Sequence, residues 1–362
     1  MSGGWNLDKE RQINLLDLSM EGLTRIMEDW DEPSFRAAQI WRWIYGSLVD
    51  DPQKMRNLPL ALRQRLTEAC YIGYLPVVER LVGDDGLTEK VALQSHDGQI
   101  IEVVLMRYAE RNTVCVSSQI GCPLGCLFCA TGRSGYSRNL TTGEITAQVL
   151  HYVRQLHRED ARVTNVVFMG MGEPMLNLDA LWQAILNLHH PEGLNMGLRR
   201  LTISTVGIVP GIERMAEWGT EVGLAISLHA PNDALRDQLV PANRRYPLAQ
   251  VMKAARYYVE QTSRRITFEY GLADGVNDSD ACAHETAELL RGMLCHVNLI
   301  PINPVIGGDY RPSPDERILR FQEILTAAGI QTTVRISRGR DIEAGCGQLR
   351  LRQQARNQKE MP

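Results

Sequence analysis

Apolar positions recur at two different periods along the chain. Before residue 75 they return every three to four positions, as on one face of a helix, so residues 15–30, 34–46 and 58–70 are each expected to be helical. Between residues 75 and 107 the pattern becomes strand-like. Residues 88–94 and 99–106 flank Asp97-Gly98, a pair that is typical of hairpin turns.

From residue 113 onward, short apolar strands alternate with amphipathic helices. Helices are expected between the strands, for example at residues 143–157, 178–190, 247–261 and 279–293, and a final helix is expected at residues 314–329. This alternation predicts a parallel sheet covered by helices, with functional side chains at the carboxyl ends of the strands. Six strands are expected in the repeating units, at residues 113–118, 164–170, 199–205, 222–229, 265–272 and 296–302.

These patterns predict an α/β fold, a partial (β/α)6 TIM-like barrel with a small N-terminal helical domain and a β-rich connector. A last short strand is expected at residues 332–337. The expected parts are residues 1–74 for the helical domain, 75–107 for the connector, 108–341 for the barrel, and 342–362 for a C-terminal loop and tail.

Composition and charge restrict the possible partners only weakly. With 362 residues, 44% of them hydrophobic, the chain can build one large and one small domain. We expect no membrane partner and a cytoplasmic location, since no run of eighteen apolar residues and no secretion signal are present. A net charge of −4 does not favour non-specific nucleic-acid binding, and the arginine pairs at 199–200, 244–245 and 264–265 fit a solvated surface.

Three of the eight cysteines lie within eight residues, as Cys122, Cys126 and Cys129. The spacing C-x3-C-x2-C lets three thiolates bind three different irons of a [4Fe–4S] cluster and leaves the fourth iron open for chemistry. A zinc site or a ferredoxin-like carrier is less favoured, because either would ask for a fourth ligand nearby. Phe128 precedes the last cysteine, and the stretch resembles the radical S-adenosylmethionine superfamily, in which the cofactor's amino and carboxylate groups bind the open iron.

Polar and small residues follow the other expected strands. A carboxylate after glycine at Gly172-Glu173 resembles the methionine-binding element of that superfamily, with Glu173 on the amino group. A lone His229 would more often be structural, but its place at a strand end favours a cofactor contact. The residues expected to bind S-adenosylmethionine are Gly172, Glu173, Ser204, Ser227, Leu228, His229 and Asn303.

A second chemical signal lies near the C-terminus. Cys346 stands between two glycines in a polar segment, which suits a reactive thiol better than a packed one. Nearby arginines would favour its thiolate. Its expected partner is Cys115, at the start of the strand that leads to the three-cysteine loop.

Several stretches together resemble the RlmN/Cfr family of RNA adenine methyltransferases. They are CVSSQIGC from Cys115 to Cys122, GMGEP, STVG, SLHAPND, YGLADGVNDS and RDIEAGCGQL, and they run from about Glu102 to Leu349. One departure is Gly345, where alanine is usual. The order and number of these motifs make a chance agreement implausible.

The resemblance implies a mechanism. Cys346 is methylated by one molecule of S-adenosylmethionine, and a second molecule, cleaved at the cluster, takes a hydrogen atom from the S-methyl group. The carbon radical adds to the adenine, Glu102 accepts the ring proton, and Cys115 attacks Cys346 to release methylated RNA as a transient disulfide forms. From the residues alone, Glu102 is merely a carboxylate in a strand.

The resemblance also implies partners. They are an adenosine in the peptidyl-transferase centre of 23S rRNA, the adenosine 3′ of the anticodon in tRNAs, and an electron donor such as flavodoxin or ferredoxin. The target base must leave its stack to reach a buried site, and residues 1–74 are expected to contact the RNA.

Two other functions remain open at this point. A Cfr-like enzyme would methylate carbon 8 of the same rRNA adenosine, although Pro174 and Ile120 look more like the RlmN branch, which methylates carbon 2. The more distant alternative is a non-catalytic module that binds an iron–sulfur cluster or zinc.

Overall fold

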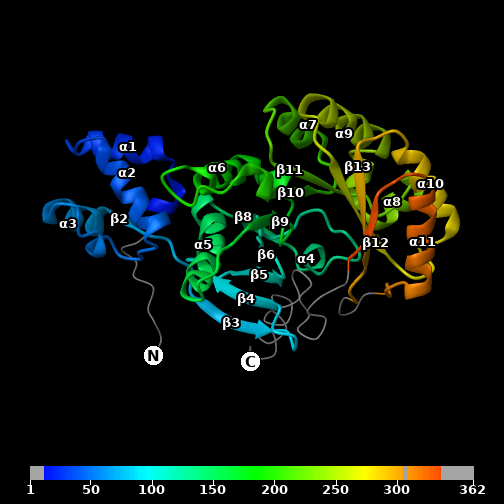
Figure 1. Cartoon of the computed structure of the whole chain (residues 1–362), viewed down its shortest axis with the longest axis horizontal. Coiled ribbons are helices and arrows are strands. Elements are labelled where there is room, and N and C mark those ends of the chain that lie inside the picture. The colour runs from blue at the N-terminus through cyan, green and yellow to red at the C-terminus, as the bar shows by residue number, and fades with distance from the viewer. Residues whose placement is uncertain (1–11, 305–308, 336–362) are drawn as a thin grey trace.

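Ten strands form one twisted sheet in the computed structural model, which describes residues 12–304 and 309–335 (Figure 1). The order is β14-β13-β12-β11-β10-β9-β6-β5-β4-β3, and every neighbouring pair from β6 to β14 is parallel. The parallel strands are β6 (Arg111–Cys115), β9 (Asn165–Phe168), β10 (Leu201–Thr205), β11 (Gly223–Ser227), β12 (Ile266–Leu272), β13 (Cys295–Pro301) and β14 (Thr332–Val334). The predicted partial barrel is confirmed.

Helices cover the outer face of the parallel strands and enclose the main apolar core with them. The longest begins with a capping box, in which Thr141 and Glu144 satisfy the first free backbone N–H groups. The covering helices are α5 (Thr142–Arg158), α6 (Leu178–His189), α7 (Val209–Glu217), α9 (Leu248–Thr262), α10 (Asp280–Leu290) and α11 (Asp315–Ala327), with the short α4 (Ala130–Arg133) and α8 (Asp233–Leu239) in strand-end loops.

The inner face of the barrel is more polar than the outer face. Along β10, Leu201 and Ile203 are fully buried in the helix-facing core, whereas Thr202 and Ser204 are only half-buried. Successive strand side chains point to opposite faces, so Thr202 and Ser204 face the barrel interior. The same alternation on the neighbouring strands places the interior side chains described below.

Three antiparallel strands extend the barrel sheet at one edge. They are β3 (Val77–Val82), β4 (Thr88–Gln94) and β5 (Ile100–Tyr108), and β5 pairs directly with β6. The expected hairpin turn lies at Asp97-Gly98, where Gly98 has a φ of +76°. These strands therefore belong to the same sheet as the barrel, while the division of the chain at residues 75 and 107 stays a prediction.

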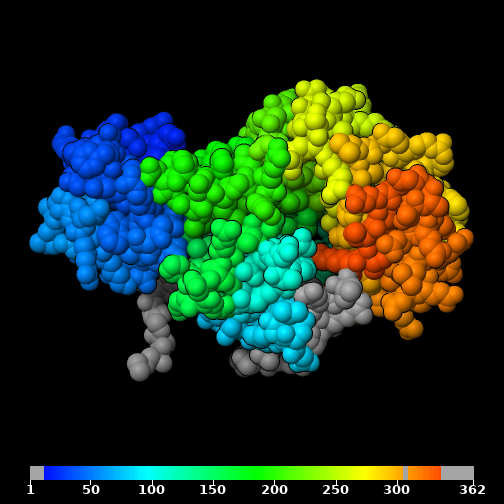
Figure 2. Space-filling view, in the orientation of Figure 1, coloured from blue at the N-terminus to red at the C-terminus, as the bar shows by residue number. Residues whose placement is uncertain are grey.

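The N-terminal helices form a lobe against α5 and α6 (Figure 2). Trp41 and Tyr45 are buried in the lobe's core, which also takes in Ala147 and Leu150 of α5. Cys70 ends a helix and begins a strand, so its expected place inside the helix is wrong by one residue. The lobe contains β1 (Ile13–Asn14), α1 (Met20–Asp29), α2 (Phe35–Trp41), a π-helical turn (Arg42–Gly46), α3 (Leu60–Ala69) and β2 (Cys70–Tyr71).

The described residues contain no helix that is both long and apolar enough to cross a membrane.

Candidate active site

The three-cysteine loop follows β6 at the carboxyl end of the parallel strands. It starts after the short strand β7 (Gln119–Gly121), which pairs with β8 (Tyr136–Asn139). Gly125 has a φ of +64°, a conformation that glycine adopts without strain. The backbone N–H of Cys129 donates to the carbonyl of Cys126 at 3.1 Å, so the loop turns tightly between these two residues.

The three thiols lie close enough to affect one another's ionisation. Burial, together with smaller effects of the neighbouring Cys129 and Glu173, raises the pKa of Cys122 to about 12. Burial also raises the pKa of Cys126, which lies near both other cysteines. Cys122 and Cys126 therefore resist ionisation and need a cationic group before they can act as thiolate ligands, and iron supplies that charge.

The donor set fits a cluster better than a single ion. Within the described ranges, no three histidine, cysteine, aspartate or glutamate side chains converge as ligands of one metal ion. In a [4Fe–4S] cluster each cysteine binds a different iron, so the ligands need not converge on one point. The residues present therefore fit a cluster held by Cys122, Cys126 and Cys129.

Glu173 lies beside this loop, at the end of β9. Its Oε1 accepts the N–H of Met175 at 3.0 Å, and its Oε2 accepts the N–H of Val206 at 2.9 Å. Complete burial raises the pKa of Glu173 to about 7, although these hydrogen bonds act against the shift. A desolvated carboxylate fixed at both oxygens fits the amino group of S-adenosylmethionine, because an ammonium group favours its ionised form.

Gly172 is required by the backbone at this point. Its φ is +102°, and a Cβ at this position would lie 2.6 Å from the Cβ of Gln119. Gln119 in turn accepts the N–H of Glu173 through its Oε1 at 2.8 Å. The glycine thus allows the three-cysteine loop and the loop of Glu173 to approach each other.

His229 follows β11 and contacts the three-cysteine loop. Its ring meets that of Phe128 edge-on, with the centroids 4.6 Å apart. Its Nδ1 accepts the backbone N–H of Gly271 at 2.8 Å, which leaves the proton on Nε2. Burial, with a smaller effect of Arg236, lowers the pKa of His229 to about 3, so the imidazole is a neutral donor.

The other predicted cofactor contacts comprise three polar side chains and one buried apolar residue. Ser204 and Ser227 are half-buried at the carboxyl ends of β10 and β11, and Asn303 is half-buried two residues beyond β13. Leu228 is fully buried in the helix-facing core, and its N–H already donates to the backbone carbonyl of Glu269 at 2.9 Å. Any ligand contact of Leu228 therefore involves its backbone.

Arg236 on α8 is a functional candidate that sequence reasoning missed. Its side chain is fully buried, and it donates to the carbonyls of Leu228 at 3.0 Å and Ser227 at 3.1 Å, and to that of Val206. Burial lowers the pKa of Arg236 to about 10, and the nearby Cys126 opposes this shift. Arg236 therefore links two strand-end loops and places a positive charge behind the cysteines.

Cys115 and Glu102 share the interior face of the sheet. Cys115 pairs with Val104 across β5 and β6, and both side chains belong to a small buried cluster on that face. Glu102 lies two residues before Val104 on the same strand, and its Oε2 is 2.6 Å from the Nζ of Lys90. The predicted base and the predicted resolving cysteine are thus neighbours in the sheet.

Glu269 is a second carboxylate that the sequence analysis missed. It lies on β12 and accepts a hydrogen bond from Nδ2 of Asn298 at 2.9 Å. Burial raises the pKa of Glu269, and Arg335 opposes this. A charged residue in the middle of an apolar strand was the signal that could have identified it.

The structure brings together the three cysteines, Glu173 and His229 at the carboxyl ends of the strands, and Cys115 with Glu102 inside the barrel. Cys346, the predicted methyl-carrying residue, lies outside the described residues.

Comparison with known proteins gives this site its class. Residues 116–287 match the family model of the radical SAM superfamily, and residues 13–72 match the ribosomal RNA large subunit methyltransferase N-terminal domain. The fold and the cysteine loop thus define a radical SAM enzyme, and this class implies a [4Fe–4S] cluster and S-adenosylmethionine.

Similar proteins identify the family within the radical SAM enzymes to which the chain belongs. A protein of Chloroflexus aurantiacus described as "Probable dual-specificity RNA methyltransferase RlmN" is 49% identical, with 92% of each chain covered. The "Ribosomal RNA large subunit methyltransferase N" of Nitrosopumilus maritimus is 46% identical, covering 93% of this chain and 98% of the relative. The crystal structure of a radical SAM methyltransferase from Sphaerobacter thermophilus has a TM-score of 0.90 and 50% identity, covering 93% of this chain and 98% of that one. The chain belongs to the RlmN family of RNA methyltransferases.

Proposed function

We propose that the chain methylates carbon 2 of an adenosine in RNA, both in the peptidyl-transferase centre of 23S rRNA and 3′ of the anticodon in tRNAs. The observation that supports this best is the arrangement of Cys122, Cys126, Cys129 and Glu173 beside a barrel whose interior face carries Cys115 and Glu102. The dual-specificity name of the relatives supports two RNA substrates.

The cofactors are one [4Fe–4S] cluster on three cysteines and two molecules of S-adenosylmethionine per turnover. Together they supply one-electron cleavage of a sulfonium bond and a radical able to take a hydrogen atom. A flavodoxin or ferredoxin is the proposed electron donor. Glu173 binds the amino group of S-adenosylmethionine, while Ser204, Ser227, His229 and Asn303 contact its ribose and adenine, and Gly172 and Leu228 contribute backbone.

The protein's own groups then complete the transfer. Cys346 carries the methyl group and bonds covalently to the adenine through the former methyl carbon. Glu102 accepts the proton that leaves carbon 2. The Cys115 thiolate attacks the sulfur of Cys346, so that a disulfide forms as the carbon–sulfur bond breaks and the methylated RNA leaves.

The parts of the chain have distinct roles in this proposal. Residues 108–341 form the catalytic barrel, residues 342–362 carry the methylated cysteine, residues 75–107 supply Glu102, and residues 1–74 contact the RNA. The match of residues 13–72 to a domain found in ribosomal RNA methyltransferases supports the last role.

An anaerobic assay with 23S rRNA and with tRNA, followed by nucleoside analysis, tests the function. We expect 2-methyladenosine from both RNAs, and 8-methyladenosine would instead support the Cfr-like alternative. Zinc without iron in anaerobically purified protein would support the non-catalytic module.

Two cysteine variants test the mechanism. Cys346→Ala should bind about four irons per chain and give no methylation, because the carrier of the methyl group is gone. Cys115→Ala should accumulate protein that is covalently joined to RNA. Free methylated product from either variant at the wild-type rate would contradict the mechanism.

A further inference from the structure

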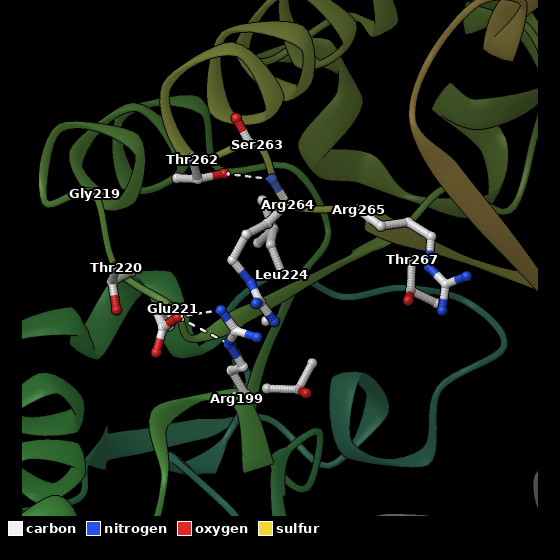
Figure 3. A pocket seen from close by; sticks show the side chains of 12 residues that line it. Arg199, Gly219, Thr220, Glu221, Leu224, Thr262, Ser263, Arg264, Arg265 and Thr267 are labelled. Atoms are coloured by element: carbon white, nitrogen blue, oxygen red, sulfur yellow. Dashed lines mark hydrogen bonds and ion pairs between the residues drawn. The ribbon is translucent and has the colours of Figure 1, made fainter.

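A polar cavity of about 600 Å³ lies at the mouth of the barrel opposite to the three-cysteine loop (Figure 3). The cysteine loop, Glu173 and His229 follow the parallel strands. The cavity is lined instead by segments that precede β10, β11 and β12, together with the first residues of these strands. Parallel strands all point the same way, so the two sites lie at opposite ends of the barrel.

The cavity is rich in positive charge. Its lining includes the side chains of Arg199, Arg264 and Arg265 but a single carboxylate, that of Glu221. Figure 3 shows the guanidinium groups of Arg199 and Arg264 pointing into the same space. We call this site the arginine cavity, defined by Arg199, Arg264 and Arg265.

These guanidinium groups have donors to spare. Arg199 uses Nε and one terminal nitrogen on the same oxygen of Glu221, at 2.8 and 2.6 Å, in a pair that is exposed to solvent. Arg265 donates to Oε1 of Gln331, and the Nε of Arg264 is buried without a hydrogen-bond partner among the described residues. Each guanidinium has five N–H donors in a planar fork that matches the oxygens of a phosphate group.

Two residues that line the cavity lie on the inner face of the barrel sheet, the face that carries Cys115. Thr202 and Gly223, which line it, are register partners of each other, and the register continues from Thr202 through Val167 to Cys115. These four positions face the same side of the sheet. Neighbouring strands are about 4.8 Å apart, so Thr202 is roughly 10 Å from Cys115. A nucleotide whose phosphate is bound in the arginine cavity could therefore place its base near Cys115.

We propose that the arginine cavity binds backbone phosphates of the substrate RNA next to the target adenosine, while the unstacked base extends into the barrel towards Cys115. This inference rests on the proposed function. Phosphate contacts fix the register of a nucleic acid without reading its sequence, and they suit a site that must serve two RNAs. The net positive charge of the lining, in a chain whose total charge is −4, concentrates the attraction at this mouth.

RNA affinity tests the cavity. The probe is a fluorescent anticodon stem-loop RNA that contains the target adenosine, titrated with the full chain at several salt concentrations. Arg199→Gln and Arg265→Gln should each weaken binding roughly three- to tenfold at 0.1 M salt and reduce the salt slope by about 1, because one phosphate contact is lost. The two variants should lose the same factor of affinity for a stem-loop RNA whose loop sequence has been changed, because phosphate contacts do not read the sequence.

Arg320→Gln is the matched control, since Arg320 is exposed and ion-paired on α11 as Arg199 is near β10. It should leave affinity and salt slope unchanged. Glu221→Gln provides a test in the opposite direction: it frees Arg199 and removes a negative charge, so RNA binding should become tighter.

The outcomes separate the two proposals. If the wild-type chain methylates neither RNA, the proposed function fails. If it methylates both, but the two arginine variants bind RNA with wild-type affinity and salt slope and Glu221→Gln does not bind it more tightly, only the arginine cavity fails.

Discussion

Lys90 and Glu102 form an ion pair that is almost wholly withdrawn from water. The exposed fractions of the two side chains are 0% and 2%, and Nζ lies 2.6 Å from Oε2. Two charges in such a place are stable only together, because a single buried charge has no water to compensate it. Lys90 is thus a positioning residue for the proposed base.

Lys90→Met should lower the free energy of unfolding by about 3–5 kcal/mol, since it removes the cation that lies beside the buried Glu102 carboxylate. The double variant Lys90→Met/Glu102→Leu should recover much of this loss, because it removes both charges. Urea denaturation of the three proteins measures the effect. A double variant no more stable than the single one would contradict the pairing.

Glu173→Gln should weaken the binding of S-adenosylmethionine about 10- to 100-fold, because a charge-assisted hydrogen bond to its amino group is lost. Isothermal titration calorimetry of the anaerobic protein measures the affinity. The iron content should stay at the wild-type level, since Glu173 is not a proposed ligand of the cluster. Unchanged affinity would exclude the proposed contact.

At the level of elements, Arg138 on β8 joins two parts of the chain. Its guanidinium donates to both carboxylate oxygens of Glu144, at 2.7 Å each, and to Asp97 at the hairpin turn, also at 2.7 Å. The Arg138 guanidinium holds the pKa of Asp97 well below its usual value of 3.8. One side chain therefore fixes the β4–β5 hairpin to the start of α5.

Arg138→Met should cost about 3 kcal/mol of unfolding free energy near neutral pH. A carboxyl whose pKa is depressed in the folded protein contributes stability above its unfolded pKa and loses it as the pH falls. The difference between variant and wild type should therefore shrink below about pH 4. Equal differences at pH 3 and pH 7, measured by urea denaturation, would refute this role.

Arg291→Met is the control for this test. Arg291 forms an exposed ion pair with Glu288, so its loss should change stability by less than about 0.5 kcal/mol.

The sequence predicted the parallel strands well because each is an apolar run between two helical patterns. The helical pattern is weaker in α7, where Pro210 and Gly211 occupy the first turn. The sequence did not reveal that β3, β4 and β5 continue the barrel sheet, since a strand's own pattern does not say which strand it pairs with.

The candidate site was predictable where a motif carried the chemistry, as with the three cysteines and Glu173. Arg236 and Lys90 were not found, because burial of a charged residue depends on partners that are distant in sequence. The arginine pairs at 199–200 and 264–265 fitted a solvated surface until the fold brought Arg199 and Arg264 to one cavity.

At the scale of the whole molecule, the N-terminal lobe and the barrel share a core. Leu150 of α5 is fully buried among lobe residues, Asp17 accepts the N–H of Gly143 at 2.5 Å, and Arg154 donates to the carbonyl of Leu48 at 2.9 Å. The lobe is therefore attached through both apolar and polar contacts.

Leu150→Ala should destabilise the protein by about 2–5 kcal/mol, because it leaves a cavity where lobe and barrel meet. Tryptophan fluorescence, to which Trp41 in the lobe contributes, and far-UV circular dichroism should report the same shifted urea midpoint. Unfolding of the lobe at a lower urea concentration than the barrel in the wild-type protein would contradict a shared core.

The shared core has a consequence for how two RNAs of different shape can use one enzyme. A lobe joined to α5 by packed side chains is held in one orientation, so the RNA-contacting surface that we propose for residues 1–74 keeps one shape. The conformational change on binding must then occur in the nucleic acid, so each RNA has to bend its own backbone to fit the protein. RNA that is already folded into an assembled ribosome should be a poor substrate. The enzyme would then act on an RNA while its backbone can still bend.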